Sequence, residues 1–355
     1  MDLTVVDPRP TVPQLLAIQA RWCERLGSPM YAGLLDRAAE DAASGGPTAG
    51  LLDGHQDDPA GSALALRFMG AVHRLVLEGG APALAAFYPS VAGTPVHGDP
   101  WPAFRVALAQ NLETLRAYVE LPVQTNEAGR SATLLGGFLT VAQETGMPMR
   151  VLEIGSSAGL NLRWDHYRYS SGAWSWGDES SPLEFPGVFE GRTPDTVSAV
   201  VVERAGCDPN PIDALTEAGR LTLMSYTWPD QTNRFRQLRG ALRVAADVPV
   251  SLERADGTSW LAHRLTDVSD GVAAVVFHSI VMQYLGESGR ANLIDVLSEA
   301  GAEATTEAPL AWLRFEPSRP DGGGRFLVTL TTWPGGNERV LAESHPHGPP
   351  VRWLA

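Results

Sequence analysis

The residues best placed to do chemistry lie in one short segment, Val151-Leu-Glu-Ile-Gly-Ser-Ser-Ala-Gly-Leu160. A mostly apolar run that carries one acid is followed by Gly155, Ser157 and Gly159 at alternating positions. This pattern predicts a strand, a tight turn and the start of a helix. Glycine has no Cβ, so the backbone of such a turn allows a ligand to approach closely. The N-terminus of the following helix offers unpaired N–H groups and a positive dipole end. The segment therefore predicts a site for a nucleotide-like cofactor.

Composition places the chain among ordinary folded proteins and excludes several partners. Its 355 residues are enough for two domains with their own cores, and 44% of them are hydrophobic and 19% charged. A net charge of −14 disfavours a broad nucleic-acid-binding face. The start of the chain does not resemble a signal peptide, and no apolar run reaches membrane-spanning length. We therefore expect a cytoplasmic protein with a small-molecule substrate and neither a nucleic-acid nor a membrane partner.

The sequence contains no lysine, since all 27 basic residues counted as Lys and Arg are arginine. Schiff-base chemistry, a P-loop lysine and a kinase lysine are thereby excluded. The two cysteines, Cys23 and Cys207, lie far apart and form no CxxC pair. His345 and His347 have no third ligand at a recognisable spacing, so we expect no metal site.

The first part of the chain, residues 1–130, is predicted to be a helical lid or substrate domain. Apolar residues at helical spacing predict helices over Pro13–Leu26, Ala63–Leu77 and Trp101–Val119. In the first of these, the expected buried face consists of Leu15, Ile18, Trp22 and Leu26, with Leu16 beside them.

The second part, residues 131–355, is predicted to be a Rossmann-like cofactor-binding domain with an insertion at about 170–220. A helix is expected to open at Leu160–Tyr169 and another to span Gln231–Ala246, with a third at Ser288–Ala300. The expected strands are Val151–Gly155, Val197–Glu203, Leu221–Tyr226, Val248–Arg254, Val272–His278, Leu310–Phe315, Arg325–Thr331 and Arg339–Ala342. Strands that alternate with helices predict an α/β fold with a mostly parallel sheet covered on both faces.

The end of the chain favours one α/β fold over another. The last two expected strands are joined by the turn Trp333-Pro-Gly-Gly-Asn337, with no helix between them. This predicts an antiparallel terminal hairpin, as in methyltransferase-type sheets, whereas a dinucleotide dehydrogenase would continue as strand–helix–strand.

Several motifs together resemble a bacterial family known as "domain of unknown function 2332", over nearly the whole chain. The motifs are Leu66–Pro89, Gln124–Ser131, Leu152–Leu162, Trp164–Tyr167, Gly206–Asp213, Trp228–Gln231 and His345–Gly348. The second half also resembles class I S-adenosylmethionine-dependent methyltransferases. That resemblance implies that Glu153, Gly155, Ser157 and Gly159 hold the methionyl part of the cofactor, with Ser157 in place of the usual middle glycine. The alternative is a tight strand-to-helix turn without a ligand.

The same resemblance implies an acid at the end of the next strand, because a carboxylate can accept both ribose hydroxyls. Asp230 follows the expected strand Leu221–Tyr226 and precedes a good helix, so the strand count favours it. Asp208 competes with it, although Pro209 and Pro211 leave little room for a helix. On this count Val197–Glu203 is an extra strand of the insertion. Asp256 would meet the adenine amino group, and the alternative for each acid is a helix cap or a turn.

Two residues near the expected strand Val272–His278 could serve catalysis. His278 could be a general base for an acceptor hydroxyl or amine, or else a hydrogen-bonded histidine at the edge of the core. Tyr284 could help to form an acceptor pocket, or simply pack.

A polar segment before the sheet domain could close over the cofactor from the helical domain. Gln124, Asn126, Glu127 and Arg130 offer donors and acceptors suited to an amino-acid or carboxylate group, with an interdomain salt-bridge network as the alternative. Asn161, Trp164, Asp165 and Tyr167 follow the glycine turn and are expected to line the same cleft.

The sequence leaves three functions open. The first is methyl transfer from S-adenosylmethionine to a small-molecule acceptor that lies between the two domains. The second is a non-catalytic binding or scaffold protein that keeps the methyltransferase-like fold. The third, a nicotinamide-dependent oxidoreductase, ranks last because a full G-x-G-x-x-G is missing.

Overall fold

The computed structural model describes residues 9–59, 62–319 and 324–355 and divides into two compact units. The helical unit comprises Met1–Thr125 and Leu221–Phe235, and the sheet unit comprises Asn126–Arg220 and Arg236–Ala355. Within the described ranges, no helix combines the length and the apolar character needed to cross a bilayer.

The helical unit is built from short amphipathic helices around one apolar core. Its helices are α1 (Val12–Arg25), α2 (Pro29–Ala43), α3 (Pro47–Leu51), α4 (Leu64–Leu77), α5 (Pro82–Ala85), α6 (Pro89–Ala92), α7 (Trp101–Gln110) and α8 (Leu112–Val119). The expected helices at α1 and α4 are confirmed, and the third is divided at Asn111 into α7 and α8. Phe68 and Phe104 pack edge to face at the centre of the core, with ring centroids 5.8 Å apart.

The buried face predicted for α1 is confirmed at Leu16, and in part at Leu15 and Leu26, but it is wrong at Ile18 and Trp22. The helix buries Leu16, Ala20 and Cys23, whereas Trp22 is 43% exposed. Both sets of residues have helical spacing, so periodicity alone does not separate them. Trp22 instead packs on the surface under the guanidinium group of Arg25.

The sheet unit contains an eight-stranded sheet in the order β11-β10-β9-β8-β7-β1-β5-β6. Its strands are β1 (Met149–Ile154), β5 (Val201–Asp208), β6 (Ser251–Arg254), β7 (Ala273–Ser279), β8 (Leu310–Pro317), β9 (Phe326–Trp333), β10 (Asn337–His345) and β11 (Gly348–Trp353). The five strands from β6 to β8 are parallel, and β9, β10 and β11 follow as an antiparallel series. The predicted α/β class, with a mostly parallel sheet and an antiparallel end, is confirmed.

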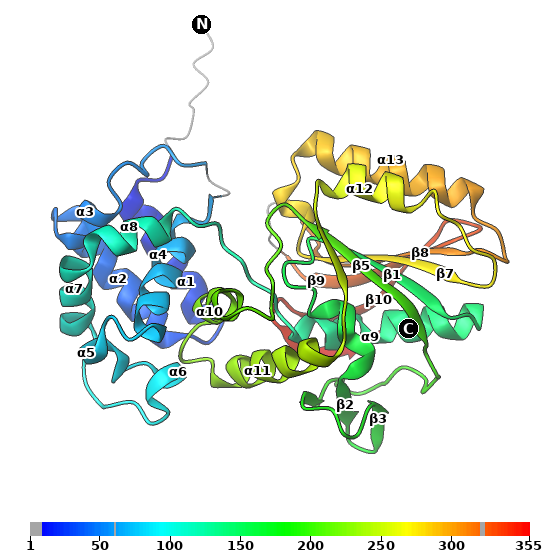
Figure 1. Ribbon diagram of the computed structural model, residues 1–355, viewed down its shortest axis with the longest axis horizontal. Coiled ribbons are helices and arrows are strands. Elements are labelled where there is room, and N and C mark those ends of the chain that lie inside the picture. The colour runs from blue at the N-terminus through cyan, green and yellow to red at the C-terminus, as the bar shows by residue number, and fades with distance from the viewer. Residues whose placement is uncertain (1–8, 60–61, 320–323) are drawn as a thin grey trace, which may run out of the picture. The chain divides into compact units, whose positions relative to one another are not determined.

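Helices cover both faces of this sheet (Figure 1). One face carries α9 (Gly129–Thr145), and the other carries α12 (Gly257–Arg264) and α13 (Glu287–Glu303). All six residues of β1 are buried, as expected for a strand covered on both faces. Two helices, α10 (Glu217–Ser225) and α11 (Thr232–Asp247), cross the boundary between the units.

Three predictions for the sheet unit are wrong. Leu221–Ser225 lies in α10 instead of a strand, and Tyr226 follows the helix in a turn. The strand predicted at Val197–Glu203 overlaps only the start of β5, which runs from Val201 to Asp208, pairs with β1 in the main sheet and is not part of an insertion. No α-helix follows the glycine turn: a short 3-10 helix, Asn161–His166, leads into β2 (Arg168–Ser171). With β3 (Trp174–Gly177) and β4 (Glu184–Pro186), β2 forms a separate three-stranded sheet.

The reason for the missing helix is the alternation of Tyr167 and Tyr169. Both rings are fully buried, and their hydroxyls donate to the carbonyls of Leu160 and Trp164. Burial of every second side chain is the pattern of a strand and not of a helix. The helical turn therefore ends after six residues, and the chain continues as a strand.

Candidate functional site at the carboxyl edge of the sheet

The topological switch point lies between β1 and β7. The chain leaves β1 for β5 and β6 on one side and returns to β7 and β8 on the other. In open parallel sheets, ligands bind outside the carboxyl ends of the strands at such a point. Acids stand at or just beyond three neighbouring ends: Glu153 in β1, Asp208 in β5 and Asp256 after β6.

Glu153 is a buried carboxyl group with one unsatisfied oxygen. It is only 2% exposed, and its Oε2 has no hydrogen-bond partner among the described residues. Asn161 donates to the carboxyl group and is itself held by the Ser131 hydroxyl, 2.7 Å from its Oδ1. Burial raises the pKa of Glu153 well above its ordinary value, although the bond from Asn161 opposes the shift. A cationic donor bound beside Oε2 would satisfy this group and restore its charge.

Asp208, and not Asp230, lies at the end of the strand next to β1. The strand that favoured Asp230 is a helix, and Asp230 belongs to the helical unit. There it accepts hydrogen bonds from the Ser28 hydroxyl (2.6 Å) and the Met30 N–H (3.0 Å), so it caps the start of α2. The sequence reasoning failed because the strand count included α10.

The oxygens of Asp208 each accept one backbone hydrogen bond. Oδ2 accepts from the Ser157 N–H at 3.0 Å, and Oδ1 accepts from the Asn210 N–H at 2.8 Å. Because a carboxylate oxygen has two lone pairs, each can accept a second donor such as a ribose hydroxyl. Asp256 uses Oδ1 to cap α12 through the N–H groups of Thr258 and Ser259. Its Oδ2 has no partner among the described residues.

The glycine turn does not offer the unpaired N–H groups that the sequence predicts. The turn's N–H groups, from Gly155 to Leu160, all donate to acceptors of the chain itself. The acceptors are the Cys207 carbonyl for Gly155 and Ser156, Asp208 for Ser157, the Asn126 Oδ1 for Ala158 and Leu160, and the Ser156 carbonyl for Gly159. With no helix behind it, the turn is not an anion cradle.

Close approach at Gly155 is used by the protein itself. Gly155 has φ +69°, and a Cβ built on it would lie 2.6 Å from Cγ2 of Val281. Val281 belongs to the loop after β7, so the two loops at the switch point touch here. The expectation that this glycine makes room for a ligand is therefore wrong. Ser157, at φ 50°, takes the left-handed conformation expected of the missing middle glycine.

His278 is not available as a general base. Its ring is fully buried, its Nδ1 lies 2.7 Å from the Glu316 Oε1, and its Nε2 accepts the Trp312 indole N–H at 3.0 Å. Because Nε2 accepts, the ring is neutral and its proton is on Nδ1. Tyr284 is 67% exposed in a three-residue 3-10 turn, Met282–Tyr284, and its hydroxyl has no hydrogen-bond partner among the described residues.

Glu316 is a residue of this edge that sequence reasoning missed. Its Oε1 accepts the N–H groups of Val281 (2.8 Å) and Met282 (3.3 Å) besides the His278 ring. These bonds hold the loop after β7, where Ile280 has φ +57°, a strained value for a β-branched residue. The position of Glu316 at the end of a predicted strand was the available signal.

The polar segment at residues 124–130 is divided between the two units. Gln124 belongs to the helical unit, whereas Asn126, Glu127 and Arg130 belong to the sheet unit. Asn126 caps the glycine turn, and Arg130 donates to the carbonyls of Ser279 (3.0 Å) and Pro346 (3.1 Å). The Glu127 carboxylate is buried 3.5 Å from His347. Asn126 and Arg130 therefore fix the loops of this edge from the start of α9.

The residues expected to line a cleft after the turn are core residues instead. Trp164 and Tyr167 are fully buried, and Trp164 stacks on Phe138 with ring centroids 4.3 Å apart. Asp165 pairs with Arg204. Of this group, only Asn161 reaches the acid of β1. Trp164 and Tyr167 cannot contact a substrate in this arrangement.

Thiolate and metal chemistry find no support in the described residues. Burial raises the pKa of both thiols, Cys23 and Cys207, to about 12. Over residues 9–59, 62–319 and 324–355, no cluster of three His, Cys, Asp or Glu side chains could hold a metal ion.

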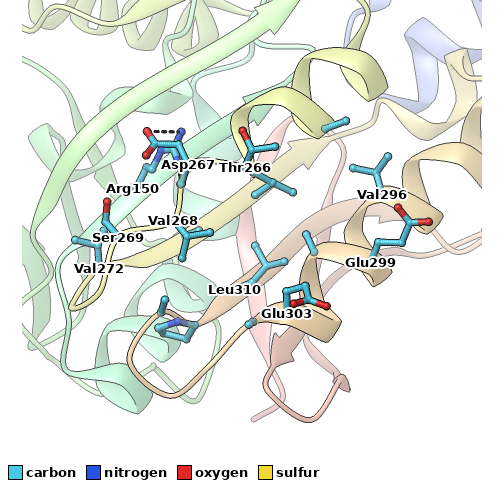
Figure 2. A pocket seen from close by; sticks show the side chains of 17 residues that line it. Arg150, Thr266, Asp267, Val268, Ser269, Val272, Val296, Glu299, Glu303 and Leu310 are labelled. Atoms are coloured by element: carbon cyan, nitrogen blue, oxygen red, sulfur yellow. Dashed lines mark hydrogen bonds and ion pairs between the residues drawn. The ribbon is translucent and has the colours of Figure 1, made fainter.

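A separate concavity opens at the other edge of the same sheet (Figure 2). It is lined by residues at the amino ends of β1, β7 and β8, among them Arg150, Ala274 and Leu310. It is therefore distinct from the edge that carries Glu153 and Asp208.

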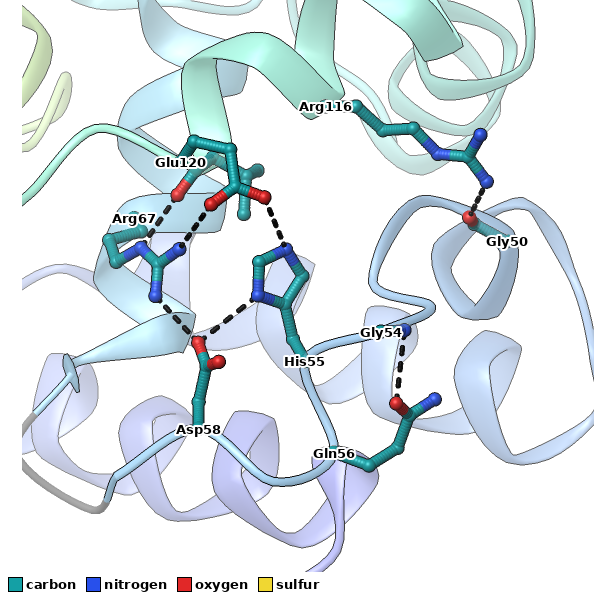
Figure 3. Close-up of polar contacts among 9 residues, drawn as sticks. Gly50, Gly54, His55, Gln56, Asp58, Arg67, Arg116 and Glu120 are labelled. Atoms are coloured by element: carbon teal, nitrogen blue, oxygen red, sulfur yellow. Dashed lines mark hydrogen bonds and ion pairs between the residues drawn. The ribbon is translucent and has the colours of Figure 1, made fainter.

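The helical unit contains its own polar cluster, His55, Asp58, Arg67 and Glu120 (Figure 3). Arg67 is buried and donates to the Val119 carbonyl at 2.6 Å and to Asp58 at 2.7 Å. His55 lies between the two acids, 3.1 Å from Asp58 and 3.5 Å from Glu120. Burial opposes ionisation of Asp58, but hydrogen bonds from Arg67 and His55 hold its pKa below its ordinary value.

Replacing the ring nitrogens of His55 should weaken this cluster. We expect His55→Phe to lower the free energy of unfolding by about 1 kcal/mol, because it removes one hydrogen bond while keeping a ring. Urea denaturation of His55→Phe, Asp58→Ala and the double variant measures the coupling between the two residues. Independent, additive effects would contradict the assigned contact.

The comparison with protein families agrees with the resemblance seen in the motifs. Residues 14–353 match the model of a family described as "Uncharacterized protein conserved in bacteria (DUF2332)". No curated protein matches the chain. Because the match spans the helical unit, the sheet, the acid of β1 and the loops around it, the chain belongs to the DUF2332 family.

Proposed function

We propose that this protein binds S-adenosylmethionine at the carboxyl edge of β1, β5 and β6 and transfers its methyl group to a small-molecule acceptor. The observation that carries the proposal is Glu153, a buried acid at the switch point whose Oε2 lacks a partner among the described residues. The α-ammonium group of the cofactor is a donor of the kind this oxygen needs.

The donor and acceptor set of the edge fits the rest of the cofactor. Asp208 has a lone pair left on each oxygen for the ribose hydroxyls, and the Asp256 Oδ2 can accept the adenine amino group. The glycine turn would contribute only van der Waals contact, because its N–H groups are already paired.

The chemistry requires positioning more than proton transfer. When bound, the cofactor supplies a methyl group already activated by the positive sulfur. The chain's own residues would orient the two reactants and exclude water. Because both nitrogens of His278 are engaged, the acceptor is expected to be a nucleophile that reacts without prior deprotonation by that ring.

Calorimetric titration with S-adenosylmethionine and S-adenosylhomocysteine tests the proposal. We expect heat of binding at millimolar ligand or below, and about tenfold weaker binding for Asp208→Asn. Asp270→Asn, which removes an exposed carboxylate at the opposite edge, should bind as the unaltered protein does. Absence of binding to both ligands would end the proposal.

The alternative, a non-catalytic protein that keeps the fold, rests on a different observation. The N–H groups of the turn are already paired, and Val281 fills the space beside Gly155. The switch point therefore needs no ligand to satisfy the turn or to fill the space beside it. This alternative requires a folded protein that binds neither cofactor, so the same titration separates the two functions. A fluorescence titration with reduced nicotinamide cofactor tests the third function, an oxidoreductase.

A further inference from the structure

The concavity at the amino edge of the sheet has the size and walls of a ligand site. Its volume is about 420 Å³, within the range of roughly 300–1,000 Å³ that small-molecule pockets occupy. It lies between α12, the segment 265–272, α13 and the start of β8. The six residues of β1 separate it from the carboxyl edge by about 20 Å.

The pocket exists because its walls are made of small apolar side chains. Five alanines line it: Ala262, Ala274, Ala300, Ala304 and Ala308. Val268 stands beside them and is 66% exposed. Protein interiors normally leave few voids larger than a water molecule, so an apolar hollow of this size favours an apolar ligand body.

The single arginine of the pocket is not available to bind an anion. Arg150 is 7% exposed, and its Nε lies 2.9 Å from a carboxylate oxygen of Glu203. Its other nitrogens donate to the backbone carbonyls of Asp267 and Arg264. A carboxylate or phosphate ligand would have to displace these partners.

The unpaired charge of the pocket is negative. Glu299 and Glu303 lie four residues apart on α13 and both line the hollow, as Figure 2 shows. Neither carboxylate has a hydrogen-bond or ion-pair partner within the described part of the chain. Like charges at this spacing repel each other, and a cation between them relieves the repulsion. The carboxylate of Asp267 also lines the hollow and is exposed, but it pairs with Arg150 at 3.9 Å and so does not add to this unpaired charge.

We propose that this pocket binds an organic cation, an amine whose apolar body fills the alanine-lined hollow while its ammonium group lies between Glu299 and Glu303. The acids select the charge, and the apolar walls select a hydrophobic substituent over a hydrophilic amine. The site goes beyond the proposed methyl transfer, because it uses the opposite edge of the sheet and none of the same residues.

Three probes with the same body and different head groups test the proposal on the full chain. In calorimetric titrations we expect 4-phenylbutylamine to bind at least tenfold more tightly than 4-phenylbutan-1-ol, and 4-phenylbutanoate to bind weakest. The Glu299→Gln/Glu303→Gln variant should bind the amine about tenfold more weakly. An ion pair at a solvent-exposed rim strengthens binding by up to about threefold, so the loss of both carboxylates gives about tenfold. The same variant should bind the alcohol unchanged.

Two further variants keep the test decisive. Glu287→Gln/Asp295→Asn removes two exposed acids of α13 that do not line the pocket, and it should bind the amine as the unaltered protein does. Ala300→Leu places a larger side chain in the hollow and should abolish binding of all three probes while leaving the circular dichroism spectrum unchanged. Equal affinity for the three head groups, or no binding of the amine at millimolar concentration, would overturn the proposal whether or not S-adenosylmethionine binds at the other edge.

Discussion

Lowering the pH from 8 to 5 should make the free energy of unfolding fall by about 2 kcal/mol more in the unaltered protein than in a His73→Asn variant. His73 lies in α4, at the centre of the helical unit, and its ring is fully buried. Its Nδ1 contacts the Ser225 carbonyl at 3.1 Å and its Nε2 contacts the Ser90 hydroxyl at 2.9 Å.

The direction of the effect follows from the pKa of the ring. Burial lowers the pKa of His73 from 6.5 to about 4, although a hydrogen bond to the Ser225 carbonyl opposes the shift. Between these two values the unfolded chain binds a proton that the folded chain does not. Stability from this group is therefore complete above about pH 6.5 and is lost progressively as the pH falls toward 4.

The His73→Asn variant isolates this one titration. The introduced amide would keep a donor near the Ser225 carbonyl but has no group that titrates in this range, so all other ionisations cancel in the comparison. Urea midpoints of both proteins at pH 8 and pH 5 give the difference, and Trp228 reports on the helical unit that contains it. If the difference in unfolding free energy between the two proteins were the same at pH 8 and pH 5, the His73 ring would not be buried in its neutral form.

The sheet could be predicted from sequence wherever burial dictates composition. Val272–His278 is almost entirely apolar because β7 is covered on both faces, and the observed strand is Ala273–Ser279. The stretch Leu221–Tyr226 is mostly apolar too, yet its first five residues form the end of a helix. Short apolar runs do not separate the helical period from the strand period, and this one error also shifted the choice of the acid after β5 from Asp208 to Asp230.

The site was predictable only in part, because its closure depends on contacts distant in sequence. The positions of Glu153 and Asp208 follow from strand ends, which local patterns reveal. That Asn126 caps the glycine turn, and that Val281 fills the space beside Gly155, depends on loops over 30 and over 120 residues away in the chain. No local sequence pattern reveals such a contact. The turn was therefore predicted to be open to a ligand, whereas contacts from distant loops close it in the structure.

Glu153→Gln should make the protein more stable at neutral pH and, at the same time, weaken cofactor binding. Burial raises the pKa of the Glu153 carboxyl, so the folded chain holds a proton that the unfolded chain releases above about pH 4.5. The stability contributed by this proton is complete below that pH and is lost as the pH rises toward the folded-state value. Glutamine resembles the protonated acid and does not titrate, so the advantage of the variant should grow from pH 4 to pH 8.

The loss of binding follows from the same substitution. A hydrogen bond to a charged group contributes about 1.5–3 kcal/mol, so replacing the carboxylate should weaken S-adenosylhomocysteine binding at least tenfold. Glu190→Gln, which changes an exposed acid of the same unit whose carboxylate has no partner among the described residues, is the matched control and should alter neither property. Thermal unfolding from pH 4 to pH 8 and calorimetry at pH 8 measure the two effects separately.

A pH-independent stability difference would contradict the buried, protonated state of Glu153. If the variant were more stable but bound S-adenosylhomocysteine as tightly as the unaltered protein, Glu153 would be buried and protonated but would not contact the cofactor. Only a group that contacts the ligand changes both the stability and the affinity.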